Sequence, residues 1–285
     1  MNRLQRRKLQ SRLAAAVCLA FGLVAVFPLF SLLYEVWMRG HSVVSWTFLT
    51  SDLRFVVQPG VGLAFGGGVR YAIVGTGIVV GLASLIGAPV GVAAGIFLSE
   101  YGRNRLGDAI RTVVDAMAGI PSIVAGLFGF AVVAARWGYS AWAGAVALAV
   151  LMVPTVTRTT EEALRTVPQS LRDASLALGG PRWYTTLRVV IPAAAGPIVT
   201  GLLLGVARIA GETAPLLLTV LGVQFYNADP TKPVATMQGL LYGFINSSIP
   251  SEQAMGWGTA LVFILAILLL NVTVRILARS RRKLA

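Results

Sequence analysis

Metal-binding and redox-active side chains are almost missing from this sequence of 285 residues. It contains one cysteine, Cys18, and one histidine, His41. A single thiol and a single imidazole cannot form an intrachain disulfide, a zinc cage or a haem site. We therefore expect no metal site, no cofactor bound by this chain, and no catalysis that depends on histidine or on paired cysteines.

Lysine is also rare, and charged residues are scarce in general. Only 12% of the residues are charged, whereas soluble domains carry about 25%. The lysines are Lys8, Lys232 and Lys283, and none of them directly follows a glycine. A Walker A loop needs a glycine-rich turn and a lysine that reaches the phosphates. We therefore expect a non-catalytic protein, which draws any energy that it uses from another chain.

Apolar residues dominate instead, at 56% of the chain and a mean hydropathy of +0.77. A helix that crosses a bilayer core of about 30 Å needs roughly 20 mostly apolar residues. The stretches that meet this requirement are 13–35, 70–98, 110–135, 141–157, 190–222 and 256–277. The first is too long for the apolar part of a signal peptide, so we expect it to be retained. The pattern predicts an all-α integral membrane protein with about six transmembrane helices.

The cations are distributed unevenly between the two sides that six spans would create. Of the 24 lysines and arginines, 18 fall with the two chain ends and the loops 99–112 and 158–188, five fall on the opposite side, and Arg208 lies inside a span. By the positive-inside rule, both termini are expected in the cytoplasm. Clustering between apolar runs favours membrane topology over nucleic-acid binding as the reason for the net charge.

The predicted cytoplasmic loop 158–188 contains the signals of a short helix. Ser170 can cap its start, with Asp173 three residues later, and Gly179–Pro181 can end it. The spacing predicts a helix over about 171–178. One small face of this helix is formed by Leu171, Ala174, Ser175 and Leu178. Such a helix either lies on the membrane surface or inserts into a groove of a cytoplasmic partner.

The same loop carries a family resemblance. Asp173-Ala174-Ser175, then Gly179, then Val189-Val190-Ile191-Pro192 reproduce the spacing of the EAA motif, with conservative replacements. The chain resembles the permease subunits of binding-protein-dependent ABC importers. This resemblance implies the type I permease fold and a coupling helix that contacts a partner ATPase, which binds ATP and magnesium. The residues that it assigns to this contact are Leu171, Asp173, Ala174, Ser175, Leu178 and Gly179.

Further stretches narrow the resemblance to the permeases of phosphate importers, over residues 66–275. They are Ala72–Thr76, Gly119–Val124, Arg158–Leu164 and Ala207–Leu216. The resemblance implies a multi-pass protein of the bacterial inner membrane that works by alternating access. It also implies a sister permease, an ATPase dimer and an external phosphate-binding protein as partners. The corresponding division of the chain is a basic N-terminus 1–12, a first span and outer loop 13–65, a permease domain 66–278 and a basic tail 279–285.

Alternatives remain open at this point. The chain could be the sister permease of the same importer, or a permease for another oxyanion or a phosphonate. A self-powered secondary anion transporter or channel is a rival from a different class, for which the EAA-like loop would have no coupling role. Transport by the purified chain without an ATPase would distinguish this last class.

Three residues near the end of the fifth predicted span are candidates for the substrate pathway. Arg208 and Glu212 are ionisable, and each such group at the centre of a span costs roughly 2.5–3.5 kcal/mol, so it usually faces protein or water. Their i, i+4 spacing predicts one helix face, where they can pair. A guanidinium suits phosphate through its forked donors, although a structural salt bridge is the alternative. The phosphate-importer resemblance assigns Arg208 and Glu212 to phosphate passage, and Thr213 belongs to the same stretch.

Glycines in the second predicted span form a regular pattern. Gly87, Gly91 and Gly95 recur at steps of four residues, so they lie along one face of a helix. Small residues in this arrangement let two membrane helices approach closely. We therefore expect this face to pack against another span.

Overall fold

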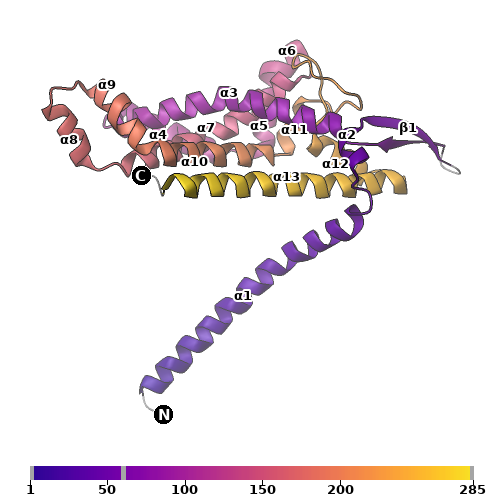
Figure 1. Ribbon diagram of the computed structural model, residues 1–285, viewed down its shortest axis with the longest axis horizontal. Coiled ribbons are helices and arrows are strands. Elements are labelled where there is room, and N and C mark those ends of the chain that lie inside the picture. The colour runs from indigo at the N-terminus through magenta and orange to yellow at the C-terminus, as the bar shows by residue number, and fades with distance from the viewer. Residues whose placement is uncertain (1–2, 59–61, 283–285) are drawn as a thin grey trace.

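The computed structural model describes residues 3–58 and 62–282, most of which are helical (Figure 1). The long helices are α1 (Arg3–Gly40), α3 (Arg70–Glu100), α7 (Ala141–Arg165), α10 (Ile191–Ala210) and α13 (Pro250–Arg282). Shorter helices are α2 (Trp46–Thr50), α4 (Arg105–Ala118), α5 (Ser122–Gly129), α6 (Ala135–Trp137), α8 (Gln169–Ala177), α9 (Arg182–Thr185), α11 (Ala214–Thr219) and α12 (Met237–Ile245). Two π-helical turns, η1 (Phe130–Ala134) and η2 (Thr186–Val190), connect α5 to α6 and α9 to α10.

The predicted number of spans agrees with the structure, but the third span is bent and the ends of the fourth and fifth spans differ. The fifth was predicted to end at 222, whereas α10 ends at Ala210. Five helical segments are long and apolar enough to cross a membrane, and a bent pair of helices makes a sixth candidate. This pair replaces the predicted straight span 110–135, because α4 and the helix after it meet at 103°. The break contains Pro121, which lacks a backbone N–H and disfavours helical geometry at Ile120. The fourth span was predicted to end at 157, but α7 continues to Arg165, which shortens the loop that follows.

The close packing expected for the glycine face is confirmed. A Cβ atom added at Gly91 of α3 would lie 2.7 Å from the Cβ of Val156 on α7. The other two glycines contact α7 in the same way, Gly87 against Met152 and Gly95 against Thr160. The absence of side chains along this face therefore sets the distance between α3 and α7.

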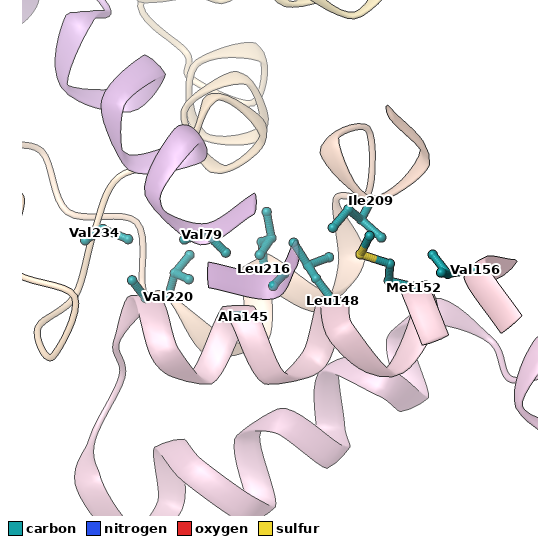
Figure 2. Packing of buried hydrophobic residues seen from close by; sticks show 11 residues of the cluster. Val79, Ala145, Leu148, Met152, Val156, Ile209, Leu216, Val220 and Val234 are labelled. Carbon is teal, nitrogen blue, oxygen red and sulfur yellow. The ribbon is translucent and has the colours of Figure 1, made fainter. Parts of the chain in front are cut away.

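The largest buried cluster surrounds α7. Leu148 and Met152 of α7 lie against Val79 of α3, Ile209 of α10 and Leu216 of α11 (Figure 2). All five side chains are fully buried. The first half of α7 therefore lies at the centre of the helix bundle, and residues on its remaining faces are positioned by the helices packed around it.

The first helix is the exception to this packing. α1 diverges from the bundle and meets α13 only near its C-terminal end, where Gly40 lies close to the backbone of Trp257 (Figure 1). In the described structure, its most apolar stretch contains no buried residue. Large side chains such as Phe21 and Phe27 are exposed. This chain alone therefore leaves most of α1 uncovered.

An antiparallel hairpin adds two strands that the all-α prediction did not include. β1 (Leu53–Gln58) pairs with β2 (Gly62–Gly67), with Phe55 opposite Phe65. The hairpin is attached to α13 through Glu252, whose Oε1 accepts a hydrogen bond from the Phe65 backbone N–H at 3.1 Å. The Ser247 hydroxyl donates to Oε2 of the same carboxylate at 2.6 Å. The hairpin is therefore an anchored part of the end opposite α8.

Along the long axis of the molecule, α1 begins and α13 ends at the end where α8 lies (Figure 1). The hairpin and the loop between α11 and α12 lie toward the other end. The basic segments that were grouped on one side in the sequence thus lie at one end of the fold.

Candidate translocation and coupling sites

The helix predicted in the loop after α7 is α8, but its start differs from the prediction. α8 begins at Gln169, and the capping position is Pro168, which has no side-chain hydrogen bond to the helix. The sequence predicted Ser170 as the N-cap, and this prediction is wrong. The Gln169 side chain instead donates to Oδ1 of Asp173 at 3.1 Å. The backbone of Pro168 is extended, so it ends the preceding segment and the helix can start one residue after it.

The end of α8 agrees with the prediction. Gly179 has a φ of +84°, which glycine adopts without the penalty that a side chain would bring. The Gly180 N–H donates to the carbonyl of Ser175 at 3.1 Å, which closes the last turn. A β-branched residue at position 179 would strain this turn.

The predicted docking face of α8 is largely uncovered in this chain. Leu178 is 90% exposed, and Leu171 and Ala174 are also exposed. Ser175 is half-buried because its hydroxyl bonds to that of Thr185 at 2.9 Å. Leucines that stand free on a nine-residue helix at one end of the molecule form a surface suited to a groove on another protein.

Arg172 attaches α8 to the end of α3, which the sequence did not predict. Its Nη2 and Nε donate to the two carboxylate oxygens of Glu100 at 2.8 and 3.2 Å. Its Nη1 also donates to the carbonyl of Val167 at 2.7 Å. Both charged side chains are mostly buried. A forked, charge-assisted pair of this kind fixes both the distance and the orientation between the end of α3 and α8.

Arg208 lies in the last turn of α10 and is exposed. Its Nη1 donates to the hydroxyl of Thr155 at 3.1 Å. Since Thr155 is near the middle of α7, the guanidinium lies well inside the membrane-spanning part of the molecule. An arginine that is exposed at this depth must face another subunit, a ligand or water.

The predicted pair of Arg208 and Glu212 on one helix face is wrong. α10 ends at Ala210, and Glu212 lies in a non-helical segment before α11, with Thr213 at the capping position of that helix. Among the residues that the structure describes, no ion pair joins Arg208 to Glu212. The cause is Pro215, which has no N–H to donate to the carbonyl of residue 211 and whose ring would clash with it in a continuous helix.

The break after α10 is stabilised from a neighbouring helix. The buried amide of Gln238 on α12 donates through Nε2 to the Ala210 carbonyl at 2.8 Å. The Thr76 hydroxyl of α3 lies 3.4 Å from Oε1 of Gln238 and accepts from the Met237 N–H at 2.9 Å. The carbonyl that the break leaves free therefore has a partner, and the segment with Glu212 and Thr213 is held next to Arg208.

A buried carboxylate lies on the same helix as Thr155, toward the α8 end. Glu161 is 2% exposed and was assigned to the loop by the sequence analysis, because α7 was predicted to end at 157. Its Oε1 accepts from Arg165 at 2.7 Å and from Arg111 of α4 at 3.1 Å. Its Oε2 accepts from Arg158 at 3.3 Å. Three guanidinium groups around one carboxylate offset the cost of its burial. Arg111 also pairs with Asp108 and Arg158 with Asp115, so the charges of this cluster are balanced.

Arg158 extends this cluster toward Arg208. It is half-buried, forms a second ion pair with Asp115 of α4, and stands three residues after Thr155 on α7. Residues at i and i+3 share a helix face. Arg208 and Arg158 thus form a succession of guanidinium groups on one side of α7, from the middle of the bundle toward the α8 end. The continuation of the apolar pattern of α7 beyond residue 157 is the signal that could have placed Arg158 and Glu161 in a span.

Comparison with known proteins agrees with this architecture. The family described as binding-protein-dependent transport system inner membrane component matches residues 87–283. Phosphate transport system permease protein PstA of Yersinia pestis is 39% identical over 278 residues, which cover 97% of this chain and 92% of that protein. Phosphate transport system permease protein PstA 1 of Mycobacterium tuberculosis strain H37Rv is 38% identical and covers 98% of this chain and 92% of its own.

Solved structures with the same fold belong to other ABC transporters. A chain of a bacterial alginate ABC transporter, solved with an alginate-bound periplasmic protein, has a TM-score of 0.69 at 11% identity and 98% coverage of both chains. A chain of the inward-facing MetNI methionine ABC transporter has a TM-score of 0.56 at 19% identity, with 75% of this chain and 94% of that chain covered. The predicted type I permease fold is therefore confirmed, and the protein is a multi-pass membrane protein. The chain belongs to the family of binding-protein-dependent transport system inner membrane components, among the PstA permeases.

Proposed function

We propose that the protein is the permease subunit of an ATP-driven importer of inorganic phosphate. The similarity to phosphate permeases over nearly the whole chain supports this substrate. The observation that carries the proposal within the structure is the exposed guanidinium of Arg208, held by Thr155 inside a membrane-spanning bundle. An oxyanion that crosses the membrane needs a charge-assisted partner at this depth, and a forked guanidinium provides two donors for it.

The pathway is formed by one side of this chain and a sister permease. Arg208 contacts the anion near the middle of the bundle, and Thr213 contributes a hydroxyl from the break. Glu212, next to them, limits how tightly the anion is held, because a neighbouring carboxylate repels it. Arg158 receives the anion on the way to the α8 end. Release from this second position is favoured because Asp115 and Glu161 already occupy its donors.

Coupling occurs at α8. A separate ATPase dimer binds ATP and magnesium, and its groove receives the face formed by Leu171, Ala174, Ser175 and Leu178. When the dimer closes, α8 moves, and the ion pair of Arg172 with Glu100 transmits this movement to α3. Alternating access then follows from the rearrangement of α3 against α7. An external phosphate-binding protein delivers the substrate at the end that carries the hairpin.

The membrane orientation follows from charge. The two chain ends and the loops 99–112 and 158–188 carry 18 of the 24 lysines and arginines in the sequence, and the described parts of these segments lie at the α8 end. This end is therefore the cytoplasmic one, and both termini are cytoplasmic. The protein belongs in the inner membrane of a bacterium, where binding-protein-dependent import operates.

The experiment is uptake of radioactive phosphate by the complete importer in proteoliposomes with ATP inside. Wild-type uptake is expected to need ATP, and Arg208→Gln is expected to abolish it while the complex still assembles. Arg136→Gln is the matched control, because Arg136 is exposed on α6, away from the proposed path. Equal uptake by Arg208→Gln and the control would contradict the pathway. ATP-dependent uptake of a labelled phosphonate without uptake of labelled phosphate would contradict the substrate, and phosphate uptake without ATP would favour a self-powered transporter.

A further inference from the structure

A large cavity lies at the α8 end, apart from the path along α7. Its volume is about 900 Å³, and it is enclosed by the end of α3, the loop to α4, the end of α7, α8 and α9. The charged side chains that line it are Arg103, Arg111, Arg165, Arg172, Arg182 and Glu100. Five guanidinium groups against one carboxylate make this the kind of enclosure that attracts anions.

Part of this positive charge is already neutralised. Arg172 pairs with Glu100, while Arg111 and Arg165 share the carboxylate of Glu161 behind the cavity wall. Arg103 and Arg182 are different, because neither has an ion-pair partner within residues 3–58 and 62–282. Both are exposed, and they come from different segments that line the cavity. Arg103 lies in the loop between α3 and α4, whereas Arg182 begins α9 after α8.

The face of α8 that borders the cavity is not its docking face. Gln169, Arg172 and Leu176 line the cavity and recur at i, i+3 and i+7, so they share one side of the helix. Leu171 and Leu178, seven residues apart, lie on another side and are absent from the lining. An ATPase bound to the leucines would therefore leave the cavity side of α8 facing this chain.

We propose that this cavity is a regulatory site for a phosphate-bearing anion, held between Arg103 and Arg182. Bound there, the anion connects the α3–α4 loop to the segment that carries α8. This bridge restricts the movement of α8 and thereby slows the transport cycle. The effect on transport rests on the proposed function, since it needs α8 to be the coupling helix. The ligand is either free phosphate accumulating on this side or the headgroup of an anionic lipid, because both present the same forked acceptor to guanidinium groups.

The test uses the complete importer in nanodiscs without the external binding protein, with the nucleotide sites filled by ADP. Binding of radioactive inorganic phosphate is measured for wild type, for the double variant Arg103→Gln/Arg182→Gln and for Arg105→Gln. Arg105 is the control, because it is an exposed arginine at the start of α4 that does not line the cavity. Nanodiscs of purely zwitterionic lipid are compared with nanodiscs that contain phosphatidylglycerol.

In zwitterionic nanodiscs, we expect the double variant to bind phosphate at least about tenfold more weakly than wild type, since it loses charge-assisted hydrogen bonds from two sides. Arg105→Gln is expected to bind as wild type does. If phosphatidylglycerol abolishes phosphate binding in wild type, the site is occupied by a lipid headgroup in the membrane; if it does not, the ligand is free phosphate. Equal phosphate affinity of wild type and double variant in both lipids would overturn the proposal.

A second measurement separates this site from the proposed function. ATP-driven uptake is measured with phosphate added on the α8 side, at rising concentrations. The double variant is expected to keep its uptake rate at low phosphate but to resist inhibition at high phosphate. An assembled wild-type importer that takes up no phosphate would contradict the proposed function. The difference in phosphate affinity between wild type and the double variant would still test whether the cavity binds the anion.

Discussion

The side-chain amide of Gln238 donates to the backbone carbonyl of Ala210 at 2.8 Å, and this bond joins α12 to the point where α10 is interrupted. Helix ends usually satisfy their last carbonyls with water or local turns. Here the partner comes from another helix, α12, and is fully buried. The tertiary structure therefore stabilises the interruption between α10 and α11.

Removing this amide is expected to destabilise the protein. In Gln238→Leu, the Ala210 carbonyl loses its buried donor, which costs about 1–3 kcal/mol. The apparent Tm of the detergent-solubilised protein should fall by several degrees. Gln253→Leu is the control, because Gln253 also donates to a backbone carbonyl, that of Ser247, but from an exposed position. Similar Tm losses in the two variants would refute a special role for the buried bond.

The contact of Gly91 with Val156 is expected to tolerate no added volume. Gly91→Ala places a methyl group 2.7 Å from the Val156 Cβ, and overpacking of this kind costs about 1–3 kcal/mol. Val156→Ala should restore a small part of the stability in the double variant, because it removes the Val156 Cγ1, which would lie 2.9 Å from the added methyl group, while the Cβ contact remains. Gly77→Ala is the control, since no atom lies within 4 Å of its added Cβ. Thermal unfolding of the four proteins checks the contact, and a lack of rescue would argue against it.

The buried carboxylate of Glu161 is expected to be essential for stability. Glu161→Gln leaves Arg111, Arg158 and Arg165 with their shared counter-charge removed, and breaking a buried ion pair costs about 3–5 kcal/mol. Its neighbour Glu162 is exposed, so Glu162→Gln should change the Tm little. The yield of folded protein and the Tm together measure the effect. A Glu161→Gln protein as stable as Glu162→Gln would show that the cluster is dispensable.

Substitution at Gly179 is expected to impair coupling without loss of assembly. Valine resists the φ of +84° found there, so Gly179→Val should distort the end of α8 and lower transport per ATP hydrolysed. Asparagine enters this backbone region more readily than other residues with a side chain. Gly179→Asn should therefore retain more coupling. The ratio of phosphate uptake to ATP hydrolysis in proteoliposomes is the measurement, and equal ratios in both variants would exclude a conformational cause.

Features that depend on local composition and residue spacing could be predicted from the sequence. The six apolar stretches, the helix before Gly179 and the glycine face of α3 depend on composition and spacing, and the structure contains all of them. The break after Ala210 was also readable, because Pro215 cannot continue a helix through residue 211. In the folded chain, the effect of this proline prevails over the i, i+4 spacing of Arg208 and Glu212.

Other features depend on partners that are distant in the sequence. Glu161 is buried only because Arg111 approaches from α4, and Arg172 meets Glu100 across 72 residues. The hairpin needs Glu252, 187 residues after Phe65, to accept the Phe65 N–H. No periodicity or motif in the sequence predicts these long-range contacts. The pathway roles of Arg208, Glu212 and Thr213 remain predictions for the experiments above.

The exposed guanidinium of Arg208 also affects the stability of the subunit in the membrane before the complex assembles. A newly inserted copy without its partners presents this charge to hydrocarbon, at a cost of roughly 2.5–3.5 kcal/mol on insertion scales. Association with a second subunit that lines the same path with water removes this cost. The exposed charge therefore makes the lone subunit less stable in the membrane than the assembled one, and we expect the lone subunit to be degraded faster.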